Sequence, residues 1–284
     1  MRIHTRTLIA AALILASANA VEAAKSAAGR AFQKFHLTDK FWAEGAHYAD
    51  FNHDGKMDVV VGPFWYAGPN FGQRHEFYPA TEKFEIKSKD GQSVTIPGYA
   101  GALSGRNAYA NNFLTFTYDF NSDGWADVLV FGFPGKETTW YENPQNKSDG
   151  HWKSHVVWDE TNNESPQFGD ITGDGKPELV AHSRGKLGYV ELNWDDPTKM
   201  GVFRAVSHAD PKRFFRYTHG FGYGDVDGDG LVDLIERDGW WRQPKGWDKK
   251  SLWKLNRVPF APEKARGGAQ MLVYDFDGDG LNDV

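Results

Sequence analysis

The chain has 284 residues, of which 40% are hydrophobic and 25% charged, a composition typical of a soluble globular protein of one large or two ordinary domains. Its net charge of −6, with no basic stripe, argues against nucleic-acid binding, and the absence of cysteine excludes disulfides and lipoprotein attachment. Eleven Trp, 20 Phe and eleven Tyr beside 31 Gly favour an all-β fold with tight turns.

Residues 1–20 have the features of a secretory signal peptide. Arg2 and Arg6 precede the apolar run 8–16, and an A-x-A cleavage site follows at 18–20. The apolar run is too short for a stable membrane span. We therefore predict a secreted protein, periplasmic or extracellular, with no membrane span after cleavage; a retained anchor is the alternative.

The next residues, 21–31, are small and polar, and we expect them to be a flexible lead-in to a domain over 32–284. The segment 32–37 alternates enough to be a strand. It resembles 152–157 and 253–258, which we expect at the outer edges of sheets. Because it precedes the first repeat, we expect it to close a ring by completing the last sheet.

Each repeated unit follows one plan. An inner strand, such as 114–118, leads into an acidic loop, an aliphatic strand leaves the loop, and a third strand carries aromatic residues. The aliphatic strands are expected at 59–61, 128–131, 179–181 and 234–235, and the third strands at 64–66, 140–144, 187–192 and 240–244. We expect the aromatic residues to pack between neighbouring sheets, with sugar stacking as the alternative.

The first unit is longer than the others. We expect an insertion near 70–100, with its own hairpin formed from 83–86 and 93–96. Insertions on one face of a repeat protein often build the binding surface.

The acidic loop is the organising motif. In its best copy Asp225, Asp227, Asp229 and Asp233 occupy positions 1, 3, 5 and 9, with Gly230 at position 6. A hard cation such as Ca²⁺ binds six to eight oxygens, and glycine permits the tight turn that gathers them. A polar turn without a metal is the alternative for a single copy.

Four further copies share this spacing. They consist of Asp50, Asn52, Asp54 and Asp58; of Asp119, Asn121, Asp123 and Asp127; of Asp170, Asp174 and Glu178; and of Asp275, Asp277, Asp279 and Asp283. The first aspartates of successive copies are 69, 51, 55 and 50 residues apart. A period near 50 is typical of a propeller or another repeat array. Extracellular calcium is abundant enough to fill weak sites, which agrees with secretion.

The motif D-x-[DN]-x-D-G-x-x-D, followed by an aliphatic strand, resembles the FG-GAP/VCBS repeat family over 32–284, and the phrases 132–136 and 140–144 are similar to secreted bacterial members. The resemblance implies an integrin-α-N-terminal-like β-propeller of four-stranded antiparallel blades. It also implies a calcium ion held by positions 1, 3, 5 and 9 of each loop. The third loop departs from the family, since Thr172 replaces an acidic ligand and Pro177 stands at position 8.

The chain ends at Val284, one residue into the strand that should leave the fifth loop. We therefore expect four blades plus the start of a fifth, in a C-terminally truncated piece of a longer propeller.

One polar residue of each unit is expected at the central mouth of the ring, five to seven residues before the first aspartate. These residues are Glu44, Asn112, Glu164, His219 and Gln270, with Arg106, Tyr109, Asn163 and Arg216 nearby in sequence. Convergent polar groups at such a mouth form a plausible ligand site. We predict that Glu44, Glu164 and His219 form a binding or catalytic cluster; a solvated rim is the alternative.

No G-x-S-x-G, H-E-x-x-H or P-loop motif is present, so binding is a better expectation than catalysis. We expect a secreted calcium-binding propeller that binds an extracellular glycan or protein. The alternative is a polysaccharide lyase or hydrolase, with His219 or Tyr109 as the base and Arg106 or Arg216 neutralising a uronate. A propeller subunit of a larger surface assembly is the third hypothesis.

Overall fold

The computed structural model describes residues 32–80, 83–97, 110–148, 150–262 and 270–284. The chain divides into two compact parts, residues 1–36 and residues 37–284, and every strand lies in the second part. We use the word unit only for one repeat, that is, one acidic loop with its four-stranded sheet. The described residues form strands, turns and loops without an α-helix. In this part of the chain no helix could therefore cross a membrane.

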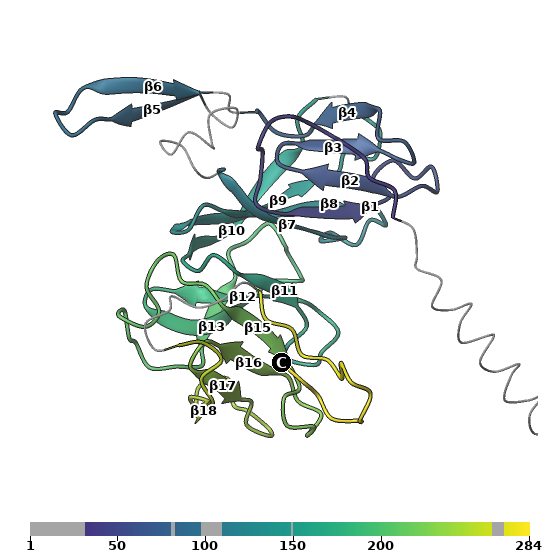
Figure 1. The fold of residues 1–284 in the computed structure, drawn as a ribbon. Coiled ribbons are helices and arrows are strands. Elements are labelled where there is room, and N and C mark those ends of the chain that lie inside the picture. The colour runs from purple at the N-terminus through teal and green to yellow at the C-terminus, as the bar shows by residue number, and fades with distance from the viewer. Residues whose placement is uncertain (1–31, 81–82, 98–109, 149, 263–269) are drawn as a thin grey trace, which may run out of the picture. The chain divides into compact units, whose positions relative to one another are not determined.

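Sixteen strands form four antiparallel sheets of four strands each, and within each sheet every strand pairs with the next one along the chain (Figure 1). The first sheet contains β1 (Ala46–Ala49), β2 (Asp58–Val61), β3 (Phe64–Ala67) and β4 (Gln73–Glu76), and the second contains β7 (Asn112–Tyr118), β8 (Asp127–Gly132), β9 (Lys136–Glu142) and β10 (Lys153–Thr161). The third contains β11 (Gln167–Gly169), β12 (Glu178–Ser183), β13 (Lys186–Glu191) and β14 (Val202–Ala205), and the fourth contains β15 (Phe221–Gly224), β16 (Asp233–Glu236), β17 (Gly239–Arg242) and β18 (Lys254–Arg257). The predicted all-β class and the four-stranded antiparallel units are confirmed.

The turns between second and third strands follow from local sequence. In the third sheet Ser183 of β12 pairs with Lys186 of β13 across a two-residue turn. Both turn residues, Arg184 and Gly185, have positive φ, 52° and 70°. This is the backbone of a type I′ turn, whose twist matches that of the strands on either side.

The aliphatic strands are buried on both faces, which explains their nearly continuous apolar sequence. In β8, Val128 and Val130 pack against Phe51 and Val60 of the first unit. The alternate residue Leu129 lies in a different cluster, together with side chains of the third sheet. Because side chains of a strand alternate between its two faces, a central strand between two sheets must be apolar throughout.

The same arrangement continues along the chain. Leu179 of β12 joins the cluster shared with the second sheet, and Val180 joins the cluster shared with Leu234 and Trp241 of the fourth. Each of these three clusters therefore contains residues from two consecutive sheets. The aromatic residues of the third strands, such as Trp140, belong to these clusters, in agreement with their expected packing role.

A backbone hydrogen bond also joins the outer strands of each consecutive pair of sheets, and we call it the outer-strand joint. The N–H of Trp152 donates to the carbonyl of Phe77 at 2.8 Å. Gly201 N–H donates to Val157 O at 2.9 Å, and Trp253 N–H donates to Val206 O at 2.9 Å. The residue just before one outer strand is thus bonded to the preceding outer strand, within it at Val157 and just past its end at Phe77 and Val206.

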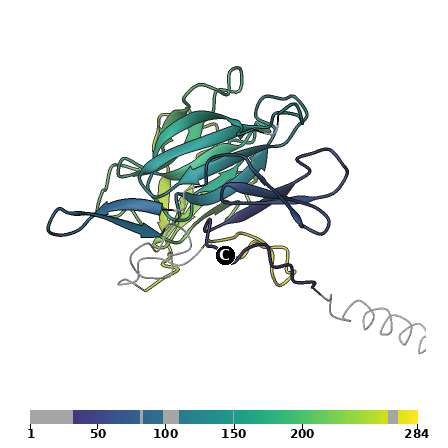
Figure 2. The same ribbon diagram turned by 90° about the horizontal axis from the view of Figure 1, so that it is seen from above.

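The hairpin expected in the long first unit is present. β5 (Lys83–Lys87) and β6 (Ser93–Pro97) pair antiparallel and form a two-stranded sheet of their own (Figure 2). Residues 73–76, which the sequence placed inside the insertion, instead form β4, the outer strand of the first sheet. The additional structure therefore begins after β4.

The prediction of a strand at 32–37 is wrong. These residues belong to no strand, and the Phe32 side chain is 94% exposed. The similar segments 152–157 and 253–258 do contribute outer strands, β10 and β18. Those two pair with the third strand of their own unit, whereas 32–37 precedes its unit, and β4 supplies the outer strand of the first sheet.

Candidate functional site

The five acidic loops share one backbone conformation. In the second loop the position 1 carboxylate, Asp119, accepts the N–H of Asp123 at 3.0 Å and of Gly124 at 2.8 Å. The glycines at position 6, Gly55, Gly124, Gly175, Gly230 and Gly280, have φ between 79° and 88°. Glycine adopts such a left-handed backbone without strain, which explains why every copy of the motif has glycine at position 6.

The side chains of positions 1, 3 and 5 gather oxygen atoms. Three groups of acidic side chains have one oxygen each within 4.8 Å of one another: Asp170, Asp174 and Glu178; Asp225, Asp227 and Asp229; and Asp275, Asp277 and Asp279. In the first two loops Asn52 and Asn121 place an amide oxygen at position 3. Carboxylate and amide oxygens are the donors that a hard cation prefers, so these side chains fit calcium.

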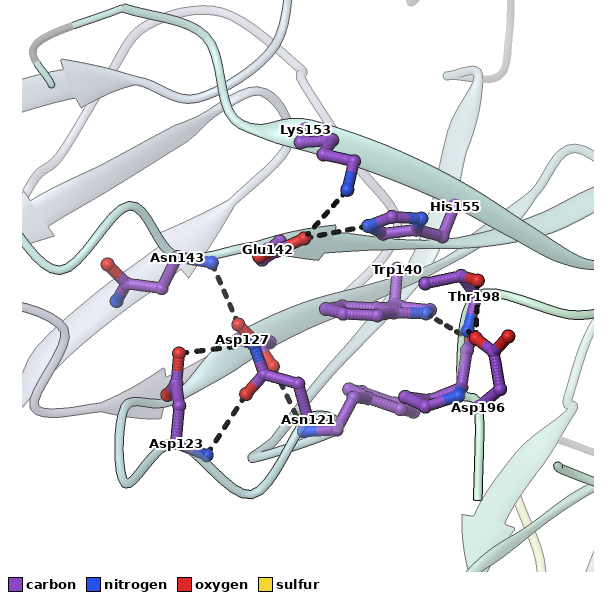
Figure 3. A network of polar contacts seen from close by, with 12 residues as sticks. Asn121, Asp123, Asp127, Trp140, Glu142, Asn143, Lys153, His155, Asp196 and Thr198 are labelled. Carbon is purple, nitrogen blue, oxygen red and sulfur yellow. Dashed lines mark hydrogen bonds and ion pairs between the residues drawn. The ribbon is translucent and has the colours of Figure 1, made fainter. Parts of the chain in front are cut away.

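The carboxylates at position 9 are tied to the backbone, a role that the sequence did not reveal. Asp127 is fully buried; its Oδ2 accepts the N–H of Phe120 at 2.9 Å and its Oδ1 that of Asn143 at 2.8 Å (Figure 3). Asp58 and Asp233 make the same two contacts in their own loops. In these three loops position 9 therefore links the loop to the end of the third strand, and each oxygen retains a lone pair for a cation.

Burial shifts the pKa of these carboxylates upward. It raises the pKa of Asp127 and of Glu178 to about 7 and that of Asp233 to about 6, against the effect of the backbone N–H groups. The neighbouring loop aspartates add to the increase through repulsion. A cation in the loop would relieve both effects, because it favours the charged carboxylates.

Two amide side chains connect an acidic loop to the following unit, and sequence reasoning missed them. Asn143 Nδ2 donates to Phe51 O at 2.9 Å, and Gln243 Nε2 donates to Ile171 O at 2.9 Å. In both cases the acceptor is position 2 of the loop in the preceding unit. The available signal was positional, since both amides follow an aromatic third strand and directly precede a proline.

The fourth loop differs from the others because a guanidinium lies on it. Arg242 Nε lies 2.8 Å from Asp227 Oδ2, and its terminal nitrogen lies 2.9 Å from Asp229 Oδ2. Hydrogen bonding to Arg242 holds the pKa of Asp229 below its usual range. Arg242 thus supplies positive charge to two of the carboxylates that a metal ion would need.

The predicted mouth residues lie where consecutive units begin. Ala43 forms a parallel bridge with Asn112, and Phe221 forms one with Gln270. Between the third and fourth units the N–H of Glu164 donates to Thr218 O at 2.8 Å. The entry segments of these pairs of units therefore lie side by side.

Three of the five mouth residues share one electrostatic environment, and we call Glu44, Glu164 and His219 the mouth cluster. His219 Nε2 lies 2.8 Å from Glu164 Oε2, and the Glu164 side chain is 7% exposed against 41% for His219. Partial burial raises the pKa of Glu44, and the charge of Glu164 raises it further. The charge of Glu164, in the third unit, therefore acts on Glu44 of the first unit.

The other mouth candidates are placed differently. Asn112 is 1% exposed, and its Nδ2 donates to Gly62 O at 3.1 Å and to the Tyr78 hydroxyl at 3.2 Å, contacts that hold two units together. Gln270 is exposed. Asn163 is buried and accepts the N–H of His182 at 2.9 Å.

Of the arginines and the tyrosine near the mouth, the described part of the chain contains Arg216. The guanidinium of Arg216 lies against Gly135, where a β-carbon would clash with it at 2.2 Å. Arg106 and Tyr109 lie outside the described residues.

A neutral histidine is buried behind the entry segments. Complete burial lowers the pKa of His182 to about 3, and the positive charge of Arg213, itself paired with Glu236, adds to the decrease. His182 Nδ1 lies 2.8 Å from the Thr218 hydroxyl, so the ring supports the strand entry that carries His219.

This histidine should make the protein sensitive to acid. Below about pH 6.5 the unfolded chain binds a proton at His182 that the folded chain excludes, so stability is lost as the pH falls, by about 1.4 kcal/mol for each pH unit. Between pH 6.5 and pH 5 the free energy of unfolding should fall by about 2 kcal/mol less in His182→Gln than in the native chain, as measured by urea denaturation. The exposed His208→Gln is the matched control and should follow the native profile; equal slopes for all three proteins would contradict the prediction.

No curated protein sequence matches the chain. Among solved structures, a lectin from Agrocybe aegerita is similar to this chain, with 16% sequence identity and a TM-score of 0.36. That lectin is described as recognising non-reducing terminal N-acetylglucosamine. The match covers 69% of this chain and 48% of that one, so the chain spans about half the length of the lectin. Residues 119–181, from the second acidic loop to β12, match the family model described as FG-GAP-like repeat.

Proposed function

We propose that the chain is an extracellular, calcium-stabilised β-propeller module of the FG-GAP/VCBS type that binds a glycan or a protein. The leader-like residues 1–20 support the extracellular location. Four similar sheets, each packed on the next through its buried strands, are the arrangement expected of successive propeller blades.

Calcium would be held by the oxygens of positions 1, 3 and 5, with a further oxygen from position 9. When bound, the ion would neutralise carboxylates that otherwise repel one another. The chain itself fixes the position 1 and position 9 carboxylates through backbone N–H groups, so the oxygens are arranged before a cation arrives. The expected role of calcium is therefore structural.

The observation that carries the ligand-binding proposal is the mouth cluster. A buried carboxylate, Glu164, orients the half-exposed ring of His219, and Glu44 contributes a second acceptor close by. Carboxylates and imidazole offer the directional hydrogen bonds that sugar hydroxyls or peptide groups need. Three polar groups supplied by three separate units make a site that exists only in the assembled module.

The test is binding to a glycan array and to a panel of extracellular proteins, with calcium present. We expect a ligand of the native chain to be lost by the variant Glu44→Gln, Glu164→Gln, His219→Gln. The matched control is Glu76→Gln, His151→Gln, which removes an exposed pair with the same chemistry and a 2.9 Å contact on β4. Unchanged binding by the mouth variant would refute this site.

An enzymatic role is the second candidate, and one contact favours it. A buried carboxylate that orients an imidazole is also the arrangement of a general base. If the chain is a polysaccharide lyase, incubation with uronate polymers should produce the absorbance of unsaturated sugars, and His219→Gln should abolish it. Retention of the polymers without products favours a binding module.

A further inference from the structure

A groove on the outer side of the third and fourth sheets collects basic side chains. It has a volume of about 370 Å³ and lies between β14, the residues after it, and the loop that precedes β18. Its basic members are Lys186, Arg204, His208, Lys249 and Lys250. None of its ten lining residues, all within the described part of the chain, is acidic.

A single neighbouring carboxylate, that of Glu191, neutralises only part of the positive charge of this basic groove. Glu191 accepts Arg204 Nε at 2.6 Å and also contacts the Lys249 ammonium, so one carboxylate serves two cations. Among the described residues, Lys186 and Lys250 form no ion pair. The groove is thus a region of excess positive charge in a chain whose net charge is −6.

The walls of the basic groove are fixed by hydrogen bonds. The outer-strand joint between Trp253 and Val206 holds the two sides together. The Ser207 hydroxyl accepts the N–H of Leu187 at 2.9 Å. Asp248 Oδ1 accepts the N–H of Lys250 at 2.9 Å, so this acidic side chain is engaged with its own loop. A site held in this way loses little conformational entropy when a ligand binds.

The basic character is a property of this groove and not of the repeat. The corresponding place between the first and second sheets is a cavity of about 700 Å³, formed by β4 and the loop before β10. Its lining mixes Arg74 and His75 with Glu76 and includes the aromatic rings of Trp65 and Trp152. The cavity between the first and second sheets therefore presents different chemistry from the basic groove.

We propose that the basic groove binds the carboxylate or sulfate group of an acidic glycan, an inference that rests on the glycan-binding function proposed above. Lys186 and Lys250 supply charges for the anionic group, and Phe203 and Leu252 offer apolar surface for a sugar ring. The volume lies within the range of small-ligand sites. The negative net charge disfavours long polyanions such as nucleic acids at a distance, whereas a single charged sugar is attracted locally.

Calorimetry with oligogalacturonate, a sulfated dextran oligomer and neutral dextran, in low and high salt, tests the proposal. We expect the acidic oligomers to bind more tightly than the neutral one, in a salt-dependent manner. Lys186→Gln, Lys250→Gln should weaken acidic binding by roughly tenfold and leave neutral glycans unaffected. Lys89→Gln, Lys147→Gln, which removes two exposed charges outside the third and fourth sheets, is the matched control and should bind as the native chain does.

The outcomes separate the two proposals. Suppose that neutral glycans bind at the mouth cluster. If acidic oligomers then bind no more tightly, or if the groove variant has no effect, the proposal for the basic groove is refuted and the proposed function stays intact. Absence of binding by every glycan, acidic or neutral, would overturn both. Loss of acidic binding in the groove variant, with native melting behaviour, would support the groove.

Discussion

Chelation of calcium with EDTA should lower the melting temperature of this chain by more than about 10 °C. A ligand present at 100 times its dissociation constant stabilises the folded state by about 2.7 kcal/mol at each site. Two of the five loops would therefore contribute about 5 kcal/mol, and 1 kcal/mol shifts the melting temperature of a chain of this size by about 2 to 4 °C.

The measurement is a thermal melt followed by circular dichroism in EDTA, repeated after calcium or magnesium is added back. Calcium should restore the transition, and magnesium should restore less of it, because magnesium demands a stricter octahedral geometry. The recovery should be smaller at pH 5 than at pH 7.5, since the pKa values of Asp127 and Glu178 are raised to about 7 and protons then compete with the ion. A melting curve that EDTA does not move would rule out calcium as a structural component.

Replacing the position 9 aspartate should destabilise the protein whether or not calcium is present. Asp127→Ala leaves the N–H groups of Phe120 and Asn143 buried without their acceptor. Each unsatisfied buried group costs about 1–3 kcal/mol, so we expect a loss of about 2–6 kcal/mol in both EDTA and calcium. Urea denaturation under the two conditions provides the measurement.

The matched control for this prediction is Asp123→Ala, at position 5 of the same loop. Asp123 is exposed, and its carboxylate accepts the side-chain amide N–H of Asn121 at 3.1 Å (Figure 3). Its loss should destabilise the protein in calcium by an amount that largely disappears in EDTA. If Asp127→Ala behaved in the same way, position 9 would serve only the metal and its contacts to the backbone would contribute little.

The strands and acidic loops could be predicted from the sequence because local rules determine them. Gly124 marks a turn with φ of 87°, and the apolar run of β8 has the length and composition of a strand buried on two faces. Neither inference needed knowledge of distant residues. The prediction of a strand at 32–37 was wrong because a strand also needs a distant partner. Alternation of polar and apolar residues shows that a segment could pair, but not that a partner is present.

The candidate site was predicted only as far as position along the chain determines it. Alignment of the repeats placed Glu164 and Asn112 at equivalent points, but not their depth. Asn112 is buried because Gly62 and Tyr78, from the preceding unit, surround its amide. The basic groove was missed because Lys186 and Lys250 lie far apart in sequence and meet only through the packing of two sheets.

The outer-strand joints carry a consequence for how such chains change. Each one ties a sheet only to its immediate neighbour, as do the amide contacts of Asn143 and Gln243. Stability in this kind of architecture is close to a sum of individual units and their nearest-neighbour contacts. Gain or loss of a terminal unit therefore leaves the sheet-to-sheet contacts of the other units unchanged, so gene rearrangements at unit boundaries offer a route by which the number of sheets can evolve.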